Sequence, residues 1–125
     1  MDTSTFLKEI GKQPGYKGQV VHVEHLPARK ARYGQLERPL PAPVQAALKR
    51  VGAERLYSHQ AEAINAARRG QHLILATGTA SGKTLAYNVP VLEAILADRQ
   101  ARALYLFPTK ALAQDQLRSL QALAE

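Results

Sequence analysis

The run Gly82-Lys83-Thr84 constrains this chain more than any other feature, because a short apolar segment and a stretch of small residues precede it. Small residues let backbone N–H groups come close to an anion, and successive N–H groups can surround phosphate oxygens. The N-terminus of a following helix adds free N–H groups and a partial positive charge. The small residues are Gly78, Thr79, Ala80, Ser81 and Gly82. The pattern therefore predicts a phosphate-binding loop between a strand and a helix.

Two side chains at the end of this loop fit a nucleoside triphosphate with its metal ion. Lys83 can reach the β- and γ-phosphates, and Thr84 can place its hydroxyl on Mg²⁺. The general pattern Gly-x4-Gly-Lys-[Ser/Thr] has glycine where this chain has Thr77. Thr77 and Ala80 resist a positive φ, but the backbone donors remain. A turn that binds nothing would not need Lys followed by Thr in the first helical turn.

The alternation of apolar runs and helical periodicity predicts an α/β chain with a parallel sheet and flanking helices. We expect buried strands over residues 72–76 and 103–107. Helices are expected over 43–51, 59–69, 83–97 and from 110 onward, and Pro90 should kink or divide the third of them. Glycine and proline punctuate residues 1–41, so this part should be irregular, with one short strand over 19–24.

Composition narrows the possible classes of protein. The chain has 125 residues and no cysteine, which excludes disulfides, thiolate metal sites and a cysteine nucleophile. No apolar run approaches the roughly 20 residues of a membrane span, so we expect no membrane partner and a cytoplasmic location. The formal net charge is +7, and residues 1–55 hold ten basic against five acidic residues. A basic first half suggests an anionic partner, nucleic acid first.

Two further segments carry side chains suited to a nucleotide base and a polynucleotide. The amide of Gln60 donates and accepts as the adenine edge does, and the ring of Tyr57 can stack on a base. Thr109 and Lys110 stand at an expected helix N-terminus, where they can hold a backbone phosphate. Each segment taken alone also has an ordinary structural explanation: a surface glutamine, a core tyrosine, and an N-cap beside a solvated lysine.

Together, these segments resemble the first motor domain of superfamily 2 helicases of the DEAD/DEAH-box type. Residues 56–60, Leu-Tyr-Ser-His-Gln, look like the Q motif of that family. Residues 79–84, Thr-Ala-Ser-Gly-Lys-Thr, look like motif I, and residues 108–113, Pro-Thr-Lys-Ala-Leu-Ala, look like motif Ia. The likeness is closest to the MrfA-type RecQ-like DNA repair helicases. Residues 19–33 resemble the lead-in of that branch less specifically.

The resemblance implies part of a RecA-like P-loop NTPase domain over residues 42–125, preceded by an irregular basic lead-in over residues 1–41. It implies ATP and Mg²⁺ as cofactors and DNA as the first candidate among nucleic acids. The acidic pair of motif II is not found after the phosphate loop. We therefore expect the N-terminal fragment of a longer ATP-dependent helicase. Such a fragment should bind ATP weakly and should need the rest of the helicase chain, with its second motor domain, for turnover.

Two alternatives stay open at this point. A small-molecule kinase or another P-loop NTPase would have a similar phosphate loop, although it needs neither the segment around Gln60 nor residues 108–113. A non-enzymatic basic module would bind nucleic acid through residues 8–55 and keep only a vestigial loop. Its affinity would then depend on phosphate contacts and fall steeply with salt.

Overall fold

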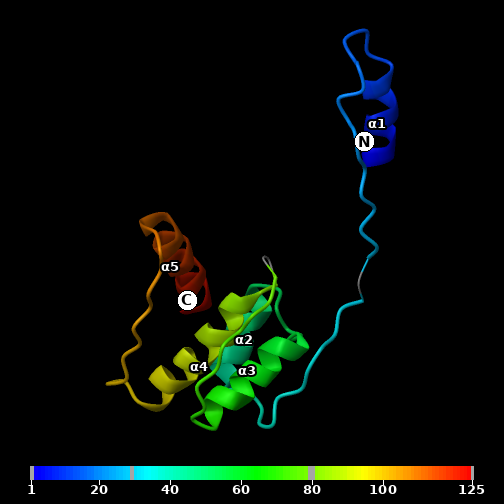
Figure 1. The fold of residues 1–125 in the computed structure, drawn as a ribbon. Helices are drawn as coiled ribbons and strands as arrows, with labels where there is room; N and C mark the ends of the chain where they lie inside the picture. Colours follow the sequence, from blue (N-terminus) through cyan, green and yellow to red (C-terminus); the bar gives the residue numbers. More distant parts are fainter. Residues whose placement is uncertain (1, 29, 79–80, 125) are drawn as a thin grey trace. The chain divides into compact units, whose positions relative to one another are not determined.

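The computed structural model of the chain describes residues 2–28, 30–78 and 81–124. By its internal contacts the chain divides between Lys30 and Ala31 into two units, and α2 to α5 belong to the second (Figure 1). The described helices are α1 (Thr3–Gly11), α2 (Ala42–Arg50), α3 (Ser58–Arg68), α4 (Lys83–Ala97) and α5 (Lys110–Ala124).

The helix α1 of the first unit was not predicted, because residues 1–41 were expected to be irregular. Asp2 caps it: one carboxylate oxygen accepts from the Thr5 N–H at 2.8 Å and the other from the Thr5 hydroxyl at 3.1 Å. These hydrogen bonds lower the pKa of the Asp2 carboxyl, since they favour its charged form. An aspartate ahead of a possible first turn was the signal that sequence reasoning passed over. The strand predicted over 19–24 is not present, because these residues form no regular secondary structure.

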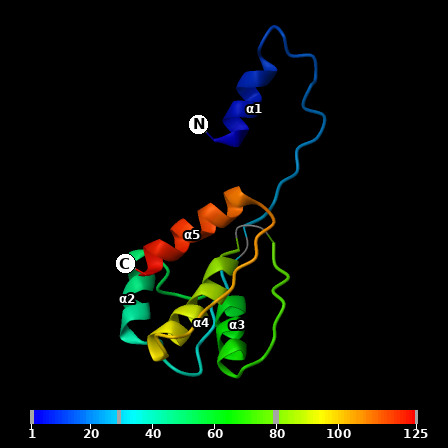
Figure 2. The same cartoon turned by 90° about the vertical axis from the view of Figure 1, so that its left-hand side faces the viewer.

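The helices of the second unit agree with the sequence expectation to within a residue or two at the ends that were predicted. Helix α3 packs along α4, and α5 contacts α2 and α4 (Figure 2). Pro90 lies inside α4, which continues through it, so the proline does not divide this helix. Gly52 and Gly70 follow the last turns of α2 and α3 and have positive φ values, a conformation that commonly ends a helix.

The hydrophobic core lies between these helices. Its buried members are Val44, Ala47, Leu48, Leu56, Ala61, Ile64, Val89 and Leu123. In α2 the buried side chains are those of Val44, Ala47 and Leu48, whereas Val51 after its last turn is 43% exposed. Buried Asn88 accepts a hydrogen bond from the Tyr105 hydroxyl at 3.0 Å, and burial raises the pKa of that tyrosine. The core therefore joins α4 to the chain that leads into α5.

The two strands of the predicted parallel sheet are not described as strands, and this part of the prediction is not confirmed. Residues 72–76 and 103–107 form no regular secondary structure, and within the described part of the chain neither pairs with a neighbouring strand. Most of their apolar side chains are exposed rather than buried: Ile74 is 95% exposed and Leu104 is 86% exposed. A strand needs a partner for its backbone hydrogen bonds, and no described segment supplies one.

The segment 31–41 runs against α3 rather than standing apart. Tyr33 and Tyr57 form an antiparallel bridge, in which the Gly34 N–H donates to the Leu56 carbonyl and the Ser58 N–H to the Arg32 carbonyl, at 3.1 and 2.8 Å. A Cβ on Gly34 would lie 2.7 Å from the Cβ of Ala61. Glycine is therefore required at this position, because the backbone of the segment 31–41 passes too close to α3 for a side chain. Whether residues 1–41 and 42–125 act as separate functional domains stays a prediction.

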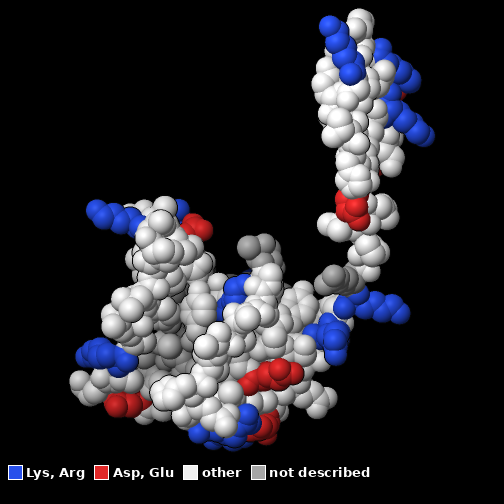
Figure 3. Space-filling view, in the orientation of Figure 1, with Lys and Arg blue, Asp and Glu red and all other residues white. Residues whose placement is uncertain are grey.

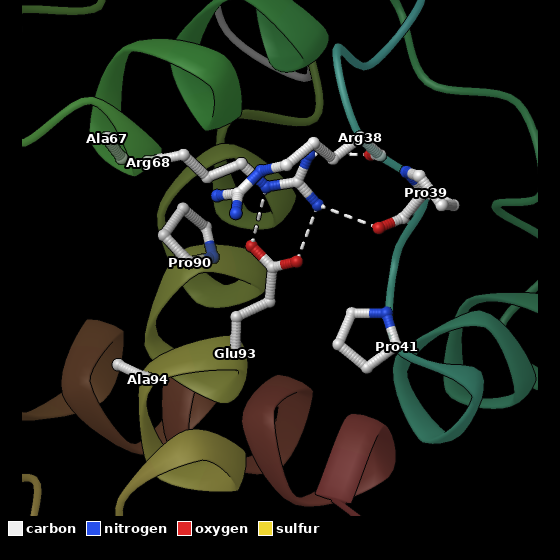
Figure 4. Close-up of a pocket in the computed structure, with 8 residues that line it drawn as sticks. All are labelled: Arg38, Pro39, Pro41, Ala67, Arg68, Pro90, Glu93 and Ala94. Carbon is white, nitrogen blue, oxygen red and sulfur yellow. Dashed lines mark hydrogen bonds and ion pairs between the residues drawn. The ribbon is translucent and has the colours of Figure 1, made fainter.

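A buried ion pair fixes α3, α4 and this segment to one another. Arg68 on α3 donates to the Glu93 carboxylate on α4 at 2.5 and 3.0 Å and also to the Arg38 carbonyl at 2.6 Å (Figure 4). The two side chains are only 7% and 17% exposed. Donation to the Glu93 carboxylate raises the pKa of Arg68 further above its ordinary value. The pair thus holds the two helices that carry the site residues.

None of the described helices is both long enough and apolar enough to cross a membrane.

Candidate nucleotide-binding site

The loop before α4 has the backbone shape that a phosphate loop needs at its last glycine. Gly82 precedes the first residue of α4 and has a φ of 75°, in the left-handed region. Lys83 and Thr84 follow in the first helical turn, so free N–H groups of the helix terminus lie beside both side chains. The predicted site residues Thr79 and Ala80 lie outside the described residues.

The ammonium group of Lys83 folds back onto the loop. It donates to the carbonyl oxygens of Thr77 and Gly78 at 2.8 and 2.6 Å, and to the Thr77 hydroxyl at 3.1 Å. The hydroxyls of Thr77 and Ser81 lie 2.7 Å from each other. The positive charge therefore lies within the turn of the loop and is satisfied there by neutral oxygens. Thr77, which stands where the general pattern has glycine, contributes two of these oxygens.

Gln60, which lies on α3, is hydrogen-bonded to the loop before α4. Its Oε1 accepts from the Tyr57 N–H at 2.8 Å, and its Nε2 donates to the Gly82 carbonyl at 2.8 Å. The residue is 2% exposed. Both ends of the amide are thus engaged by the protein, and the reading of adenine by Gln60 stays a prediction that requires these bonds to be exchanged.

A row of stacked aromatic rings, with one guanidinium group, lies beside the same loop. The rings of Tyr33 and Tyr57 stack at 5.4 Å, and those of Tyr57 and His59 at 5.9 Å. The Arg55 guanidinium lies 3.7 Å from the centre of the Tyr33 ring. His59 Nε2 donates to the Ser81 carbonyl at 2.9 Å, since a carbonyl can only accept. A base that stacks on Tyr57, as the sequence predicts, must take the place of one of its two ring neighbours.

The predicted metal ligand Thr84 is connected to α5. Its hydroxyl donates to Gln116 Oε1 at 3.2 Å, and the Tyr87 hydroxyl donates to the same oxygen at 2.6 Å. All three side chains are half-buried. The structure therefore places a polar network of α4 and α5 residues directly beside the loop.

The predicted nucleic-acid residues lie where α5 begins. The hydroxyl of Thr109 accepts from the Leu112 N–H at 3.2 Å, which confirms the predicted cap of this helix. Thr109 and Lys110 are both exposed. On the face that Figure 3 shows, basic and acidic side chains of the second unit are interspersed rather than gathered into one patch. A contact of this face with nucleic acid would thus depend on particular residues.

Sequence reasoning missed several residues of the site. His59 was placed in the Q-motif segment without a contact, and Tyr57 was not predicted as the N-cap of α3. Tyr33, Tyr87 and Gln116 were not singled out as site residues. The i, i+3 spacing of Thr84 and Tyr87 on one helical face was an available signal for that pair. The contact with Gln116 depends on tertiary packing alone.

Comparison with known proteins places this geometry in a family. The family described as DEAD/DEAH box helicase matches residues 57–125, more than half of the chain. The ATP-dependent helicase hrq1 of Schizosaccharomyces pombe is 44% identical over 117 residues, which are 91% of this chain and 11% of that protein. The chain belongs to the DEAD/DEAH box helicase family.

Solved structures agree with this assignment. A crystal structure of the DUF1998 helicase MrfA bound to DNA superposes with a TM-score of 0.80 at 36% identity, covering 99% of this chain and 16% of that one. A second, bound to DNA and AMPPNP, has a TM-score of 0.78 at 35% identity and covers 100% and 18%. The expected RecA-like helicase fold is supported, without its parallel sheet. The chain spans less than a fifth of the length of these relatives.

Proposed function

We propose that this chain binds ATP through the loop before α4 and nucleic acid through the start of α5, as part of the first motor domain of an ATP-dependent DNA helicase. The observation that carries the proposal is the placement of the Lys83 ammonium within the loop, 2.6 Å from the Gly78 carbonyl and 2.8 Å from the Thr77 carbonyl. A cation held by neutral carbonyls in a loop of small residues is suited to an anionic ligand.

Each residue of the loop has a part in nucleotide binding. Lys83 exchanges its carbonyl partners for phosphate oxygens, which are charged and make stronger hydrogen bonds. The left-handed Gly82 turns the backbone into the first turn of α4, and the N-terminus of this helix favours the same anion. Gln60 and His59 hold the Gly82 and Ser81 carbonyls from α3, which keeps the loop in place. Of the predicted phosphate-binding set, Thr79 and Ala80 enter this proposal on their sequence positions alone.

The residues present also fit Mg²⁺. Thr84 offers a neutral hydroxyl oxygen in the first turn of α4, and Mg²⁺ prefers oxygen ligands shared with nucleotide phosphates. The hydroxyl proton is directed to Gln116 Oε1, so the lone pairs of the Thr84 oxygen remain available. The ion, when bound with ATP, neutralises charge on the phosphates.

The proposed nucleic-acid contact rests on the exposed pair Thr109 and Lys110. The helix terminus supplies partial positive charge and Lys110 a full charge, which together favour a backbone phosphate. Two solved relatives are described as bound to DNA, and one of them also as bound to AMPPNP, an ATP analogue. DNA-dependent hydrolysis and strand separation belong to the longer helicase, in which a second motor domain would complete the site.

The test is a fluorescence titration of the full 125-residue chain with a mant-labelled ATP in the presence of Mg²⁺. Lys83→Ala should weaken nucleotide affinity about tenfold or more, because a charge-assisted hydrogen bond contributes about 1.5–3 kcal/mol. Lys49→Ala, an exposed lysine on α2, is the matched control and should bind as the wild type does.

Three results would contradict the proposal. Equal nucleotide affinities of the Lys83→Ala and wild-type chains would show that the loop before α4 does not bind the nucleotide. Tight binding of a small phosphate acceptor, without any response to DNA, would favour a kinase. Binding of DNA by residues 8–55 together with no nucleotide binding would favour the basic module.

A further inference from the structure

The hydroxyl of Thr84 is held by a residue outside the phosphate loop. Gln116 Oε1 lies 3.2 Å from Thr84 Oγ1 and 2.6 Å from the Tyr87 hydroxyl oxygen, and it accepts from both. The Tyr87 hydroxyl oxygen also lies 3.4 Å from Thr84 Oγ1. A tyrosine hydroxyl has a single proton, and the shorter distance assigns that proton to Gln116. The Thr84 oxygen therefore gives its own proton to Gln116.

A threonine hydroxyl binds a cation through an oxygen lone pair, while its proton needs an acceptor elsewhere. Groups that accept from a ligand orient it and tune its affinity for the metal, even though they do not touch the ion. Gln116 occupies such a position toward Thr84. Tyr87 fixes Gln116 in turn, because its hydroxyl occupies the other side of the same amide oxygen.

We propose that Gln116 is a positioning residue for the binding of Mg²⁺ with nucleotide: it takes the hydroxyl proton of Thr84 and leaves the oxygen lone pairs of Thr84 for the ion. This inference rests on the proposed function of the loop. Because Gln116 lies on α5, it also ties the metal ligand to the helix that begins with the candidate nucleic-acid residues.

The experiment is a Mg²⁺ titration of the full chain in the presence of mant-labelled ATP, followed by fluorescence, with a parallel nucleotide titration in EDTA. Gln116→Leu should lower the apparent Mg²⁺ affinity about tenfold, as loss of an outer partner of a ligand does. Its nucleotide affinity in EDTA should equal that of the wild type. Gln116→Glu keeps an oxygen acceptor and should restore Mg²⁺ affinity. Tyr87→Phe should give a smaller loss than Gln116→Leu.

Gln121→Leu is the matched control, since it makes the same change at an exposed position of α5. Thermal unfolding of every variant shows whether the fold is kept. Equal Mg²⁺ affinities for the Gln116→Leu and Gln121→Leu chains would overturn the inference, and so would an equal loss of nucleotide affinity with and without Mg²⁺. A wild-type chain that binds no nucleotide would instead contradict the proposed function, and the inference with it.

Discussion

The Gln60 side chain on α3 and the Gly82 carbonyl before α4 are joined by a hydrogen bond of 2.8 Å. The same glutamine accepts from the N–H of Tyr57, so one buried amide satisfies the start of α3 and supports the phosphate loop. A Cβ on Gly82 would lie 2.6 Å from Gln60 Nε2, so the Gln60 side chain would have to shift away from its present position. Gly82 is therefore constrained both by its φ of 75° and by its neighbour.

Gly82→Ala should distort the loop and abolish nucleotide binding. The left-handed conformation costs a non-glycine residue about 1–2 kcal/mol, and the contact with Gln60 adds to this cost. Thermal unfolding by circular dichroism and titration with labelled ATP measure the two effects. Gly70→Ala is the control, because Gly70 has a φ of 70° and open space around its Cβ position. Equal stability losses for the two variants would show that the Gln60 contact is unimportant.

Arg68→Met should lower the free energy of unfolding by about 3 kcal/mol, since it leaves the Glu93 carboxylate buried without its partner. Denaturant unfolding measures this loss. The neighbouring change Arg69→Met removes an exposed ion pair with Glu37 and should cost less than about 1 kcal/mol. A similar loss of unfolding free energy for both variants would show that the Arg68–Glu93 ion pair does not stabilise the packing of α3 on α4.

Gly34→Ala should destabilise the second unit by about 1–3 kcal/mol through overpacking against α3. Its Cβ would lie 2.9 Å from the Cα of Ser58, a backbone atom that cannot turn aside. Because Gly34 and Ser58 flank the bridge of Tyr33 with Tyr57, near-ultraviolet circular dichroism should report the change in the tyrosine stack. Gly15→Ala has open space at the same position and should be neutral. An unchanged tyrosine signal in Gly34→Ala would contradict the packing described.

Lys110→Ala should weaken the binding of single-stranded DNA without changing any sequence preference. Loss of one phosphate contact lowers the slope of log affinity against log salt by about 0.7 for a single strand. Fluorescence anisotropy of a labelled oligonucleotide at several NaCl concentrations gives this slope. Lys49→Ala serves as the control of equal charge. If both variants lower the slope equally, the DNA strand is attracted by the net positive charge of the chain and not by a specific contact at the start of α5.

Much of the second unit was predictable because its signals are local. The small residues up to Gly82, with Lys83 and Thr84 after them, predict a turn into a helix, and the structure has that turn. Helices α2 and α5 follow from apolar periodicity and from the cap at Thr109. The resemblance to helicases needed only these motifs in order, and the family match confirms it.

The two predicted strands could not be predicted correctly from their own residues. An apolar run such as residues 72–76 has a strong preference for extended backbone, but the structure has no regular secondary structure there. A sheet also requires a second backbone at hydrogen-bonding distance, which is a property of the tertiary structure. Since no described segment pairs with either run, most of their apolar side chains remain exposed.

The amino-acid sequence by itself determined the turn of small residues before α4, the helices that flank it and the family to which the chain belongs, because each depends on residues close together along the chain. Tertiary structure alone decided that Gln60 is used to brace Gly82, that Arg68 is buried against Glu93, and that Gln116 accepts from Thr84. Each of these contacts joins residues more than 20 positions apart. Such contacts form only when helices pack, and packing depends on the shapes of all the side chains between them.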